Sequence, residues 1–362
     1  MCTLHQIDPQ KAEAFGGQLL DMFNHGALSI MLSMGHRTGL FDTLSTLPPA
    51  TSEEIALAAG LHERYVREWL GAMAAGGIVE VTPDRGAPKY TLPVEHAACL
   101  TSAAGADNMG VFSQYIGLMG AVEDQVVDCF RHGGGVAYSE YKRFHEVMAE
   151  DSGQSVVSSL FDAILPLVPG MEARLEQGIE VLDVGCGMGR ALNLLARTYP
   201  KSRFTGYDLS EEAIDAARNE AKEHGNSNVQ FEVRDLTTFD EEAPADRFDL
   251  ITSFDAIHDQ ARPDRVLSGI RRALKADGVY LMQDISASSR VENNLDHPLG
   301  PLLYTISTMH CMTVSLAQGG MGLGTMWGRE KARELLHAAG FSQIEIYQLE
   351  HDIQNDYYVI RI

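Results

Sequence analysis

An apolar run that ends in Asp183 and three alternate glycines is the part of this 362-residue chain best suited to binding a small molecule. Gly185, Gly187 and Gly189 let the backbone turn tightly and lie against a ligand where a Cβ atom would collide. A helix that follows such a loop points unpaired N–H groups at the ligand. A dinucleotide loop needs its third glycine one place later, where Arg190 stands, so the spacing predicts another kind of nucleoside site.

Acidic residues at the ends of later strands extend this predicted site. Residues 203–209 form a predicted second strand, in which Asp208 is placed to accept hydrogen bonds from both hydroxyls of a ribose. A third strand, 229–235, ends in Asp235, whose carboxylate suits an adenine amino group. A fourth strand, 247–255, ends beside the expected reaction site. Ligands of open α/β sheets lie outside the carboxyl ends of the strands, so these strand ends predict one shared site.

Two histidines are candidate proton acceptors near that edge. His258 follows the fourth strand, and Asp259 beside it is suited to orient the ring or to bind substrate. His310 is the second candidate, and a base of this kind typically accelerates proton removal by about 10²- to 10⁴-fold. Structural roles remain open for both: His258 as a helix cap or backbone partner, and His310 as a hydrogen-bonded core residue. Cys311 is either a soft ligand or a buried thiol.

The elements that must position these residues form an α/β domain. Strands alternate with helices over residues 176–362, and seven strands are predicted in all. The helix 210–223 has Ser210 as a predicted N-cap. A long insertion, 286–328, separates the fifth and sixth strands and exceeds the length of an ordinary connection, which predicts a functional segment or a lid.

The first 100 residues predict a winged helix. Thr51 and Glu54 have capping-box spacing, a second helix follows a short turn, and a hairpin at 78–92 completes the pattern. Eleven acidic residues face six basic ones over this region, and Arg64 and Arg67 alternate with glutamates on the would-be recognition helix. Because DNA-binding modules neutralise several phosphates, this charge balance favours dimerisation and substrate covering over DNA binding.

A helical linker and lid is predicted at 101–175. Within it, three glycines at 133–135 precede an aromatic cluster that contains Tyr138 and Phe144. These two rings are suited to cover a cofactor, and core packing between domains is the alternative.

Composition narrows the choice of partners and compartment. The net charge of −22 disfavours nucleic acid and anionic membranes as partners. No apolar run reaches the roughly 20 residues of a membrane span, and the amino terminus lacks the pattern of a secretory signal. Five scattered cysteines without a Cys-x-x-Cys pair argue against a disulfide framework or a structural zinc site. We therefore expect a cytoplasmic protein without a metal.

The motifs together resemble one family. The chain is similar to two-domain class I methyltransferases that use S-adenosylmethionine (SAM) and carry an amino-terminal winged helix. This group is often labelled as transcriptional regulators and is related to small-molecule O-methyltransferases. The resemblance is carried by Asp-Val-Gly-Cys-Gly-Met-Gly at 183–189, Phe-Asp-Ala-Ile-His-Asp-Gln at 254–260, His-Cys-Met-Thr-Val-Ser-Leu at 310–316 and Gly-Leu-Gly-Thr-Met-Trp-Gly at 322–328. The match around His258 is partial, because the tryptophan usual after the His-Asp pair is absent.

The resemblance implies a fold, a cofactor and a reaction. The fold would be a seven-stranded Rossmann-like sheet with an antiparallel last strand, in a homodimer. SAM would lose its methyl group to a small-molecule acceptor and leave as S-adenosylhomocysteine. The implied cofactor-binding residues are Asp183, Gly185, Cys186, Gly187, Gly189, Asp208, Leu209, Asp235, Leu236 and Phe254, with Tyr138 and Phe144 as cover.

Two other functions remain as alternatives. A SAM-sensing transcriptional regulator would use the winged helix as its DNA-binding output, and a macromolecular methyltransferase would need an open groove. The sequence leaves open whether oxygen, nitrogen or sulfur accepts the methyl group.

Overall fold

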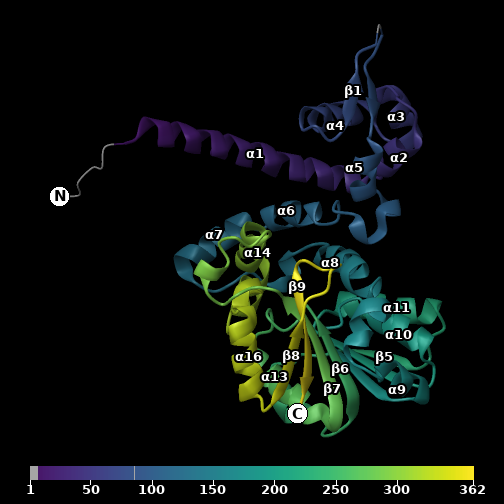
Figure 1. The fold of residues 1–362 in the computed structure, drawn as a ribbon, viewed down its shortest axis with the longest axis vertical. Coiled ribbons are helices and arrows are strands. Elements are labelled where there is room, and N and C mark those ends of the chain that lie inside the picture. The colour runs from purple at the N-terminus through teal and green to yellow at the C-terminus, as the bar shows by residue number, and fades with distance from the viewer. Residues whose placement is uncertain (1–6, 85) are drawn as a thin grey trace. The chain divides into compact units, whose positions relative to one another are not determined.

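The computed structural model describes residues 7–84 and 86–362, which divide into two compact units (Figure 1). The first unit runs to Gly117 and the second begins at Leu118. The stretch 101–175, predicted as a linker, therefore contributes to both units. No helix of the described residues combines the length and apolar character that crossing a membrane requires.

The first unit is a helical domain with a two-stranded wing. Its elements are α1 (Pro9–Arg37), α2 (Leu40–Thr46), α3 (Ser52–Ala59), α4 (Glu63–Ala75), β1 (Glu80–Thr82), β2 (Lys89–Thr91), α5 (Val94–Leu100) and η1 (Ser102–Asp107). The predicted capping box starts α3: Thr51 Oγ1 accepts from the Glu54 amide at 3.3 Å, and the Glu54 carboxylate accepts from the Thr51 amide at 2.8 Å. Trp69 packs edge-on against Phe41 in the core. The winged-helix prediction is confirmed.

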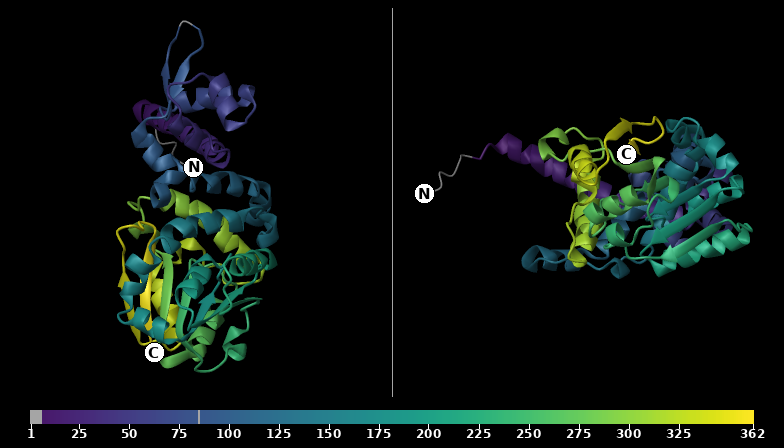
Figure 2. Two further views of the ribbon diagram at one scale, coloured as in Figure 1. Left: turned by 90° about the vertical axis from the view of Figure 1, so that its right-hand side faces the viewer. Right: turned by 90° about the horizontal axis from the view of Figure 1, so that it is seen from below.

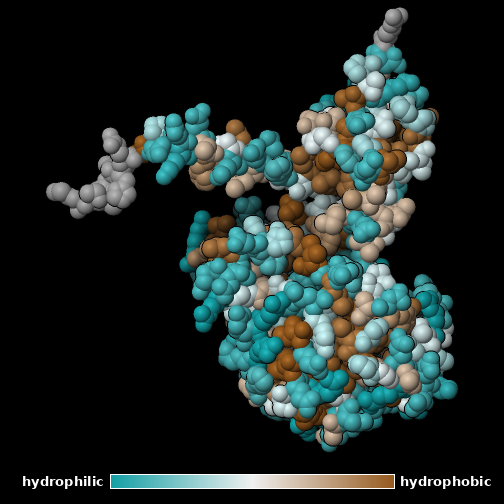
Figure 3. Space-filling view, in the orientation of Figure 1, coloured by the Kyte–Doolittle hydropathy of each residue, from teal (hydrophilic) through white to brown (hydrophobic). Residues whose placement is uncertain are grey.

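Helix α1 is long and mostly solvent-exposed. Asp8 caps its start by accepting from the Gln10 and Lys11 amides. Only Ser33 and Gly35 are buried along its 29 residues. Figure 3 shows polar and apolar side chains mixed along this helix. Its exposed large apolar residues are Phe15, Leu20, Met22, Phe23, Ile30 and Met34.

The second unit is built around a seven-stranded sheet of order β5-β4-β3-β6-β7-β9-β8. Its strands are β3 (Glu180–Val184), β4 (Arg203–Asp208), β5 (Val229–Val233), β6 (Phe248–Phe254), β7 (Leu274–Ile285), β8 (Gln343–Tyr347) and β9 (Asn355–Arg361). Neighbouring strands are parallel except at β9, which runs antiparallel to both β7 and β8. The predicted seven-stranded fold with an antiparallel last strand is confirmed.

Helices cover both faces of this sheet (Figures 1 and 2). One buried cluster joins the sheet to α9 (Met171–Gln177), α10 (Arg190–Thr198) and α11 (Glu211–Glu223). A second cluster joins the other face to α12 (Phe239–Glu242), α13 (Pro263–Ala273) and α16 (Gly328–Ala338). Because β3 has β4 on one side and β6 on the other, the chain reverses direction across the sheet at β3, which opens a crevice at the carboxyl ends of these strands.

The remaining segments of this unit lie before and within the sheet domain. They are α6 (Ser113–Gly120, which spans the division between the units), α7 (Glu123–His132), η2 (Tyr138–Glu140), α8 (Phe144–Ser152), η3 (Gly153–Val157), η4 (Leu160–Ile164) and η5 (Leu165–Leu167). The predicted insertion is itself folded into η6 (Val291–Asn293), α14 (Gly300–Ile306), η7 (Ser307–Cys311), α15 (Met312–Ala317) and η8 (Thr325–Trp327). Trp327 is buried, so this end of the insertion is anchored in the domain.

Candidate active site

The glycine loop after β3 has the close packing that its sequence predicts. Gly185, Gly187 and Gly189 all have positive φ angles, of 73°, 51° and 67°. A Cβ atom at Gly185 would lie 2.4 Å from the Ala256 side chain, and one at Gly189 would lie 2.5 Å from the Phe231 ring. Gly187 faces open space. The loop is therefore tightly packed at Gly185 and Gly189, and its backbone is accessible to a ligand at Gly187.

Asp208 at the end of β4 joins this loop to the start of α11. One of its carboxylate oxygens accepts from the Gly187 amide and the other from the Ser210 amide, each at 2.8 Å. Ser210 in turn caps α11 through the Ala213 amide, as predicted. Each carboxylate oxygen retains a lone pair. The half-buried carboxylate can therefore also accept from a ligand diol without giving up its structural bonds.

The residues after β4 and β5 differ in exposure. Strand β5 ends at Val233, two residues before the predicted end. The Arg234 amide still donates to the Asp208 carbonyl at 2.7 Å, and the Asp235 carboxylate then accepts from the Thr237 amide at 2.9 Å. Asp235 is exposed and retains acceptor capacity, whereas Leu236 is buried in the core. Leu209 is exposed on the other side of Asp208. Only Asp235 and Leu209 of these predicted cofactor residues thus have exposed side chains.

Asp183 and Cys186 lie beneath the loop. The Thr252 hydroxyl donates to the Asp183 carboxylate at 2.7 Å, which ties β3 to β6. Burial, opposed by this hydrogen bond, raises the pKa of Asp183 to about 7. Burial also raises the pKa of the Cys186 thiol well above its usual range. The Cys186 sulfur packs against Gly206, where a Cβ atom would lie 2.8 Å away. Both side chains therefore support the loop from below.

His258 is held by a carboxylate that the sequence analysis did not select. Its Nδ1 donates to Asp284 at 2.8 Å, and the same Asp284 oxygen accepts from the Trp327 indole at 2.9 Å and from the Ile285 amide at 2.8 Å. Burial alone would lower the pKa of His258, but the Asp284 carboxylate, together with Cys311, raises it well above the usual range. The ring is therefore fixed in orientation and favours its charged form.

Asp259 does not take the ring-orienting role considered for it. Its carboxylate accepts from the Gln260 side chain at 3.4 Å, and Asp284 occupies the position beside the His258 ring. Burial, partly opposed by His258, raises the pKa of Asp259 to about 6. The available sequence signal for Asp284 was an acid near the end of the fifth strand, because β7 pairs with β6 and the carboxyl ends of such strands are where ligands of open α/β sheets lie.

His310 lies inside an aromatic cluster made of Tyr138, Tyr141, Phe144, His145 and His310. Its ring stacks on Phe144 with centroids 3.6 Å apart and meets Tyr141 edge-on at 4.6 Å. The side chain is fully buried, and neither ring nitrogen has a hydrogen-bond partner among the described residues. Burial lowers its pKa well below the usual range, so the ring is neutral at pH 7. The satisfied-core alternative for His310 therefore does not match the structure.

Tyr138 connects the aromatic cluster to the nucleoside site. Its ring lies edge-on to His310 at 5.2 Å and stacks on His145 at 5.1 Å. Burial, followed by the carboxylates of Asp259 and Asp208, raises the pKa of its phenol well above the usual range. Tyr138 therefore lies within electrostatic range of the acid at the end of β4, and its role as a ligand cover stays a prediction.

Asp255, between Phe254 and His258, is half-buried and forms a group with the buried His258 and Asp284. One ligand atom each from Asp255, His258 and Asp284 lies within 4.8 Å of the other two. Such a group can hold a transition metal in principle. Here His258 Nδ1 and Asp284 lie 2.8 Å apart and hydrogen-bond to each other.

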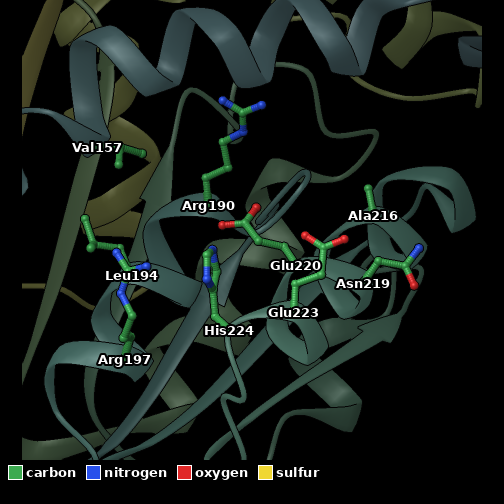
Figure 4. A pocket seen from close by; sticks show the side chains of 9 residues that line it. All are labelled: Val157, Arg190, Leu194, Arg197, Ala216, Asn219, Glu220, Glu223 and His224. Atoms are coloured by element: carbon green, nitrogen blue, oxygen red, sulfur yellow. The ribbon is translucent and has the colours of Figure 1, made fainter.

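A surface groove of about 620 Å³ lies away from these residues, against α10, α11 and Val157. Its wall mixes both signs of charge, and no residue predicted as catalytic or cofactor-binding contributes to it (Figure 4). The groove is lined by Val157, Arg190, Leu194, Arg197, Ala216, Asn219, Glu220, Glu223 and His224. We therefore centre the candidate site on the sheet edge.

Family comparisons agree with this architecture. Residues 26–102 match a family model described as an Rv2258c-like winged HTH domain, and residues 175–340 match one described as a methyltransferase domain. The chain is a winged helix-turn-helix domain followed by a methyltransferase domain. The methyltransferase model covers the glycine loop, Asp208, His258, Asp284 and His310.

Individual relatives share part of the methyltransferase domain or the whole fold. A malonyl-[acyl-carrier protein] O-methyltransferase of Paenibacillus sp. is 31% identical over 31% of this chain and 41% of its own length. A fatty-acid O-methyltransferase of Mycolicibacterium smegmatis is 32% identical over 30% of this chain and 38% of its own length. The chain thus aligns with about two fifths of these curated relatives.

The solved structure of human N-acetylserotonin methyltransferase in complex with SAM superposes with a TM-score of 0.68 at 17% identity. The superposition covers 100% of this chain and 99% of that one. The two proteins therefore share one fold from end to end.

Proposed function

We propose that this chain transfers a methyl group from SAM to a small molecule. The observation that carries the proposal is that two groups of side chains lie at the same edge of the sheet. The Asp208 carboxylate bridges the glycine loop and α11, and the His258–Asp284 pair lies beyond the neighbouring strand β6. Contact between Gly185 and Ala256 brings the loop to within two residues of His258.

The first group suits the adenosine part of SAM. Asp208 has free lone pairs for the two ribose hydroxyls, and the exposed Asp235 at the next strand end suits the adenine amino group. Bare backbone at Gly187 allows a ligand to lie against the loop. SAM, when bound, supplies a methyl group on a sulfonium that is open to in-line displacement.

The second group suits removal of a proton from the acceptor. Because Asp284 holds Nδ1, the basic nitrogen left to His258 is Nε2. Hydroxyl and thiol acceptors need such a base, whereas a neutral amine does not. The proposal therefore favours oxygen or sulfur as the atom that accepts the methyl group. The acceptors named for the relatives are malonyl-[acyl-carrier protein], a fatty acid and N-acetylserotonin, and they share no carbon skeleton.

His310 is proposed to bind the acceptor and not to remove its proton. A neutral imidazole offers one N–H donor and one acceptor nitrogen, which together match a hydroxyl group. The rings of Tyr138, Tyr141 and Phe144 form apolar walls around it and exclude water. A closed aromatic cluster of this kind supports a small acceptor over a macromolecule.

A transcriptional regulator is the weaker alternative because the arginines of the would-be recognition helix α4 form ion pairs with glutamates of the same helix. Arg64 pairs with Glu68, and Arg67 pairs with Glu63, one helical turn away. Salt-dependent, sequence-selective DNA binding by the full chain would favour this alternative.

We also propose a homodimer in the cytoplasm. Exposed apolar side chains along α1, Phe23 among them, are costly in water and suit an interface with a second copy. The described cysteines are free thiols, which suits a reducing compartment. A Phe23→Glu substitution should convert the dimer to a monomer in analytical ultracentrifugation, and a monomeric wild type would contradict the dimer.

The activity is tested by incubating the full chain with SAM carrying a labelled methyl group and a panel of small hydroxyl, carboxyl and thiol compounds. The proposal expects labelled product and S-adenosylhomocysteine with at least one acceptor class, and loss of both in Asp208→Asn. Label that reaches only protein or nucleic acid would overturn the assignment to small molecules.

A further inference from the structure

The strand order of the sheet fixes the direction in which a bound nucleoside must run. Asp235 follows β5, Asp208 ends β4, the glycine loop follows β3, and Asp255 follows β6. Neighbouring strands lie about 4.8 Å apart, so these groups form a row along one edge. A ligand with its adenosine at Asp235 and Asp208 must extend the rest of its length across the loop toward β6.

Asp255 lies where that row continues. A Cβ atom at Gly185 would be 2.4 Å from the side chain of Ala256, so the glycine loop rests directly against the residue after Asp255. Asp255 has a φ of 54°, in the left-handed region that non-glycine residues seldom adopt. Its amide donates to the Gln283 carbonyl at 3.0 Å, which holds this backbone in place. The strained conformation therefore presents one specific side chain at the end of β6.

The Asp255 side chain has an oxygen that the protein leaves without a partner. Its Oδ1 is buried and accepts no hydrogen bond in the described structure. The charges that act on it are the His258 imidazole and the carboxylates of Asp284, Asp151 and Asp352. The one positive ring is thus opposed by three carboxylates. An unpaired buried carboxylate oxygen of this kind is costly, and a cationic donor would remove the cost.

Two side-chain amides close to this region also have an oxygen that accepts no hydrogen bond in the described residues. Gln283 and Asn355 are 1% and 2% exposed, and their side-chain nitrogens both donate to Asp352, at 3.3 Å and 3.0 Å. Their side-chain oxygens have no hydrogen-bond partner within residues 7–84 and 86–362. The surplus on this side of β6 therefore consists of acceptor oxygens and negative charge, and a primary ammonium group, with three donors and one positive charge, matches it.

We propose that Asp255 binds the α-ammonium group of the methionyl part of SAM and of its product. This assignment rests on the proposed function, since it continues the same ligand past Asp208. It makes Asp255 a cofactor-binding residue, separate from the base His258. Burial and the neighbouring carboxylates, opposed by His258, raise the pKa of Asp255 well above its usual range, which favours a protonated carboxyl in the free protein. Arrival of the ammonium group would release that proton.

The test compares two ligands that differ only in the methionyl part. S-adenosylhomocysteine and 5′-methylthioadenosine share the adenosine and a neutral sulfur, but only the first has an amino-acid group. Calorimetric titration of the full chain with each ligand is made for wild type and Asp255→Asn, since asparagine tolerates the left-handed backbone. We expect the substitution to lower the affinity for S-adenosylhomocysteine on the order of 10- to 100-fold and the affinity for methylthioadenosine by less than about 2-fold.

A matched control is Asp235→Asn, which should weaken both ligands by the same factor because both carry adenine. An analogue of S-adenosylhomocysteine without the amino group should bind wild type and Asp255→Asn equally. Equal loss of both ligands in Asp255→Asn, or no loss of either, would overturn the assignment of Asp255. A wild type that binds neither ligand would overturn the SAM site itself, which is a different failure.

Discussion

Helix α4 of the winged helix and the carboxyl edge of the sheet differ in whether their charged and polar side chains have partners. On α4, Arg64 and Arg67 lie in solvent and pair with glutamates one turn away. At the sheet edge, Asp255, Asp284 and His310 each keep a buried polar atom without a partner. Exposed helical pairs contribute only about 0.3–0.5 kcal/mol each, whereas an unpaired buried polar group costs about 1–3 kcal/mol.

This difference indicates where binding takes place. Arginines that are already paired with glutamates on the same surface attract a phosphate backbone only weakly. A buried edge with unpaired donors and acceptors is destabilising until a ligand supplies the missing partners. Variants that remove polar groups from the sheet edge or from α4 test this difference.

The largest effect is expected from His258→Gln. Glutamine can still donate to Asp284, but it cannot take a proton, so kcat should fall about 10²- to 10⁴-fold. Affinity for S-adenosylhomocysteine should change less than about 2-fold. Initial rates with an acceptor from the labelled-methyl screen measure the first quantity and calorimetry the second. Turnover within a few-fold of wild type would show that His258 is not the base.

Asp284→Asn should alter both the rate and its pH dependence. His258 must be neutral to accept a proton, so the wild-type rate should rise with pH through a pKa above 6.5, because Asp284 favours the charged ring. Without that carboxylate the pKa falls and the rising limb moves to lower pH, while misorientation lowers the plateau by about 10²-fold. Profiles of kcat/KM against pH test this. A limb that stays in place would mean that another group controls it.

His310→Phe should increase stability and reduce function. Removing two unpaired polar atoms should raise the free energy of unfolding by about 1–2 kcal/mol, and loss of the acceptor hydrogen bond should lower kcat/KM about 10- to 100-fold. Tyr141→Phe is the matched control in the same cluster. Its hydroxyl donates to the Met309 carbonyl, so its loss should reduce stability. Urea denaturation measures both, and destabilisation by His310→Phe would contradict the proposed role.

The smallest effect is expected on the winged helix. Glu68→Gln removes one exposed partner of Arg64 and should change the free energy of unfolding by less than about 0.5 kcal/mol. Fluorescence anisotropy with duplex DNA at about 150 mM salt should show no sequence-selective binding by either the variant or wild type. Selective binding that weakens with added salt would remove the contrast between the two regions.

The sequence was sufficient where the relevant residues are neighbours along the chain. The glycine loop, the capping box of α3, the Ser210 cap of α11 and the strand–helix alternation all depend on local spacing, and the structure has them. Asp259 was selected because it adjoins His258, but strand β7 supplies the carboxylate that holds the ring. That pairing depends on the register of β6 against β7, where Phe254 lies opposite Gln283. A single sequence does not reveal this register.

The acceptor side of the site was the hardest to predict for the same reason. His310 was chosen as a candidate, but its ring is enclosed by Tyr138, Tyr141 and Phe144, which lie far earlier in the chain. Asp255 also went unrecognised as a binding residue, because nothing in its local sequence shows that its carboxylate is buried without a partner. Both properties come from packing and not from spacing.

The central claim, that the sheet edge binds SAM, is tested most directly by calorimetric titration of the full chain with S-adenosylhomocysteine. We predict saturable binding of about one ligand per chain, and loss of this binding in Asp208→Asn with the fold retained by circular dichroism. No binding by wild type, or equal binding by Asp208→Asn, would contradict the account.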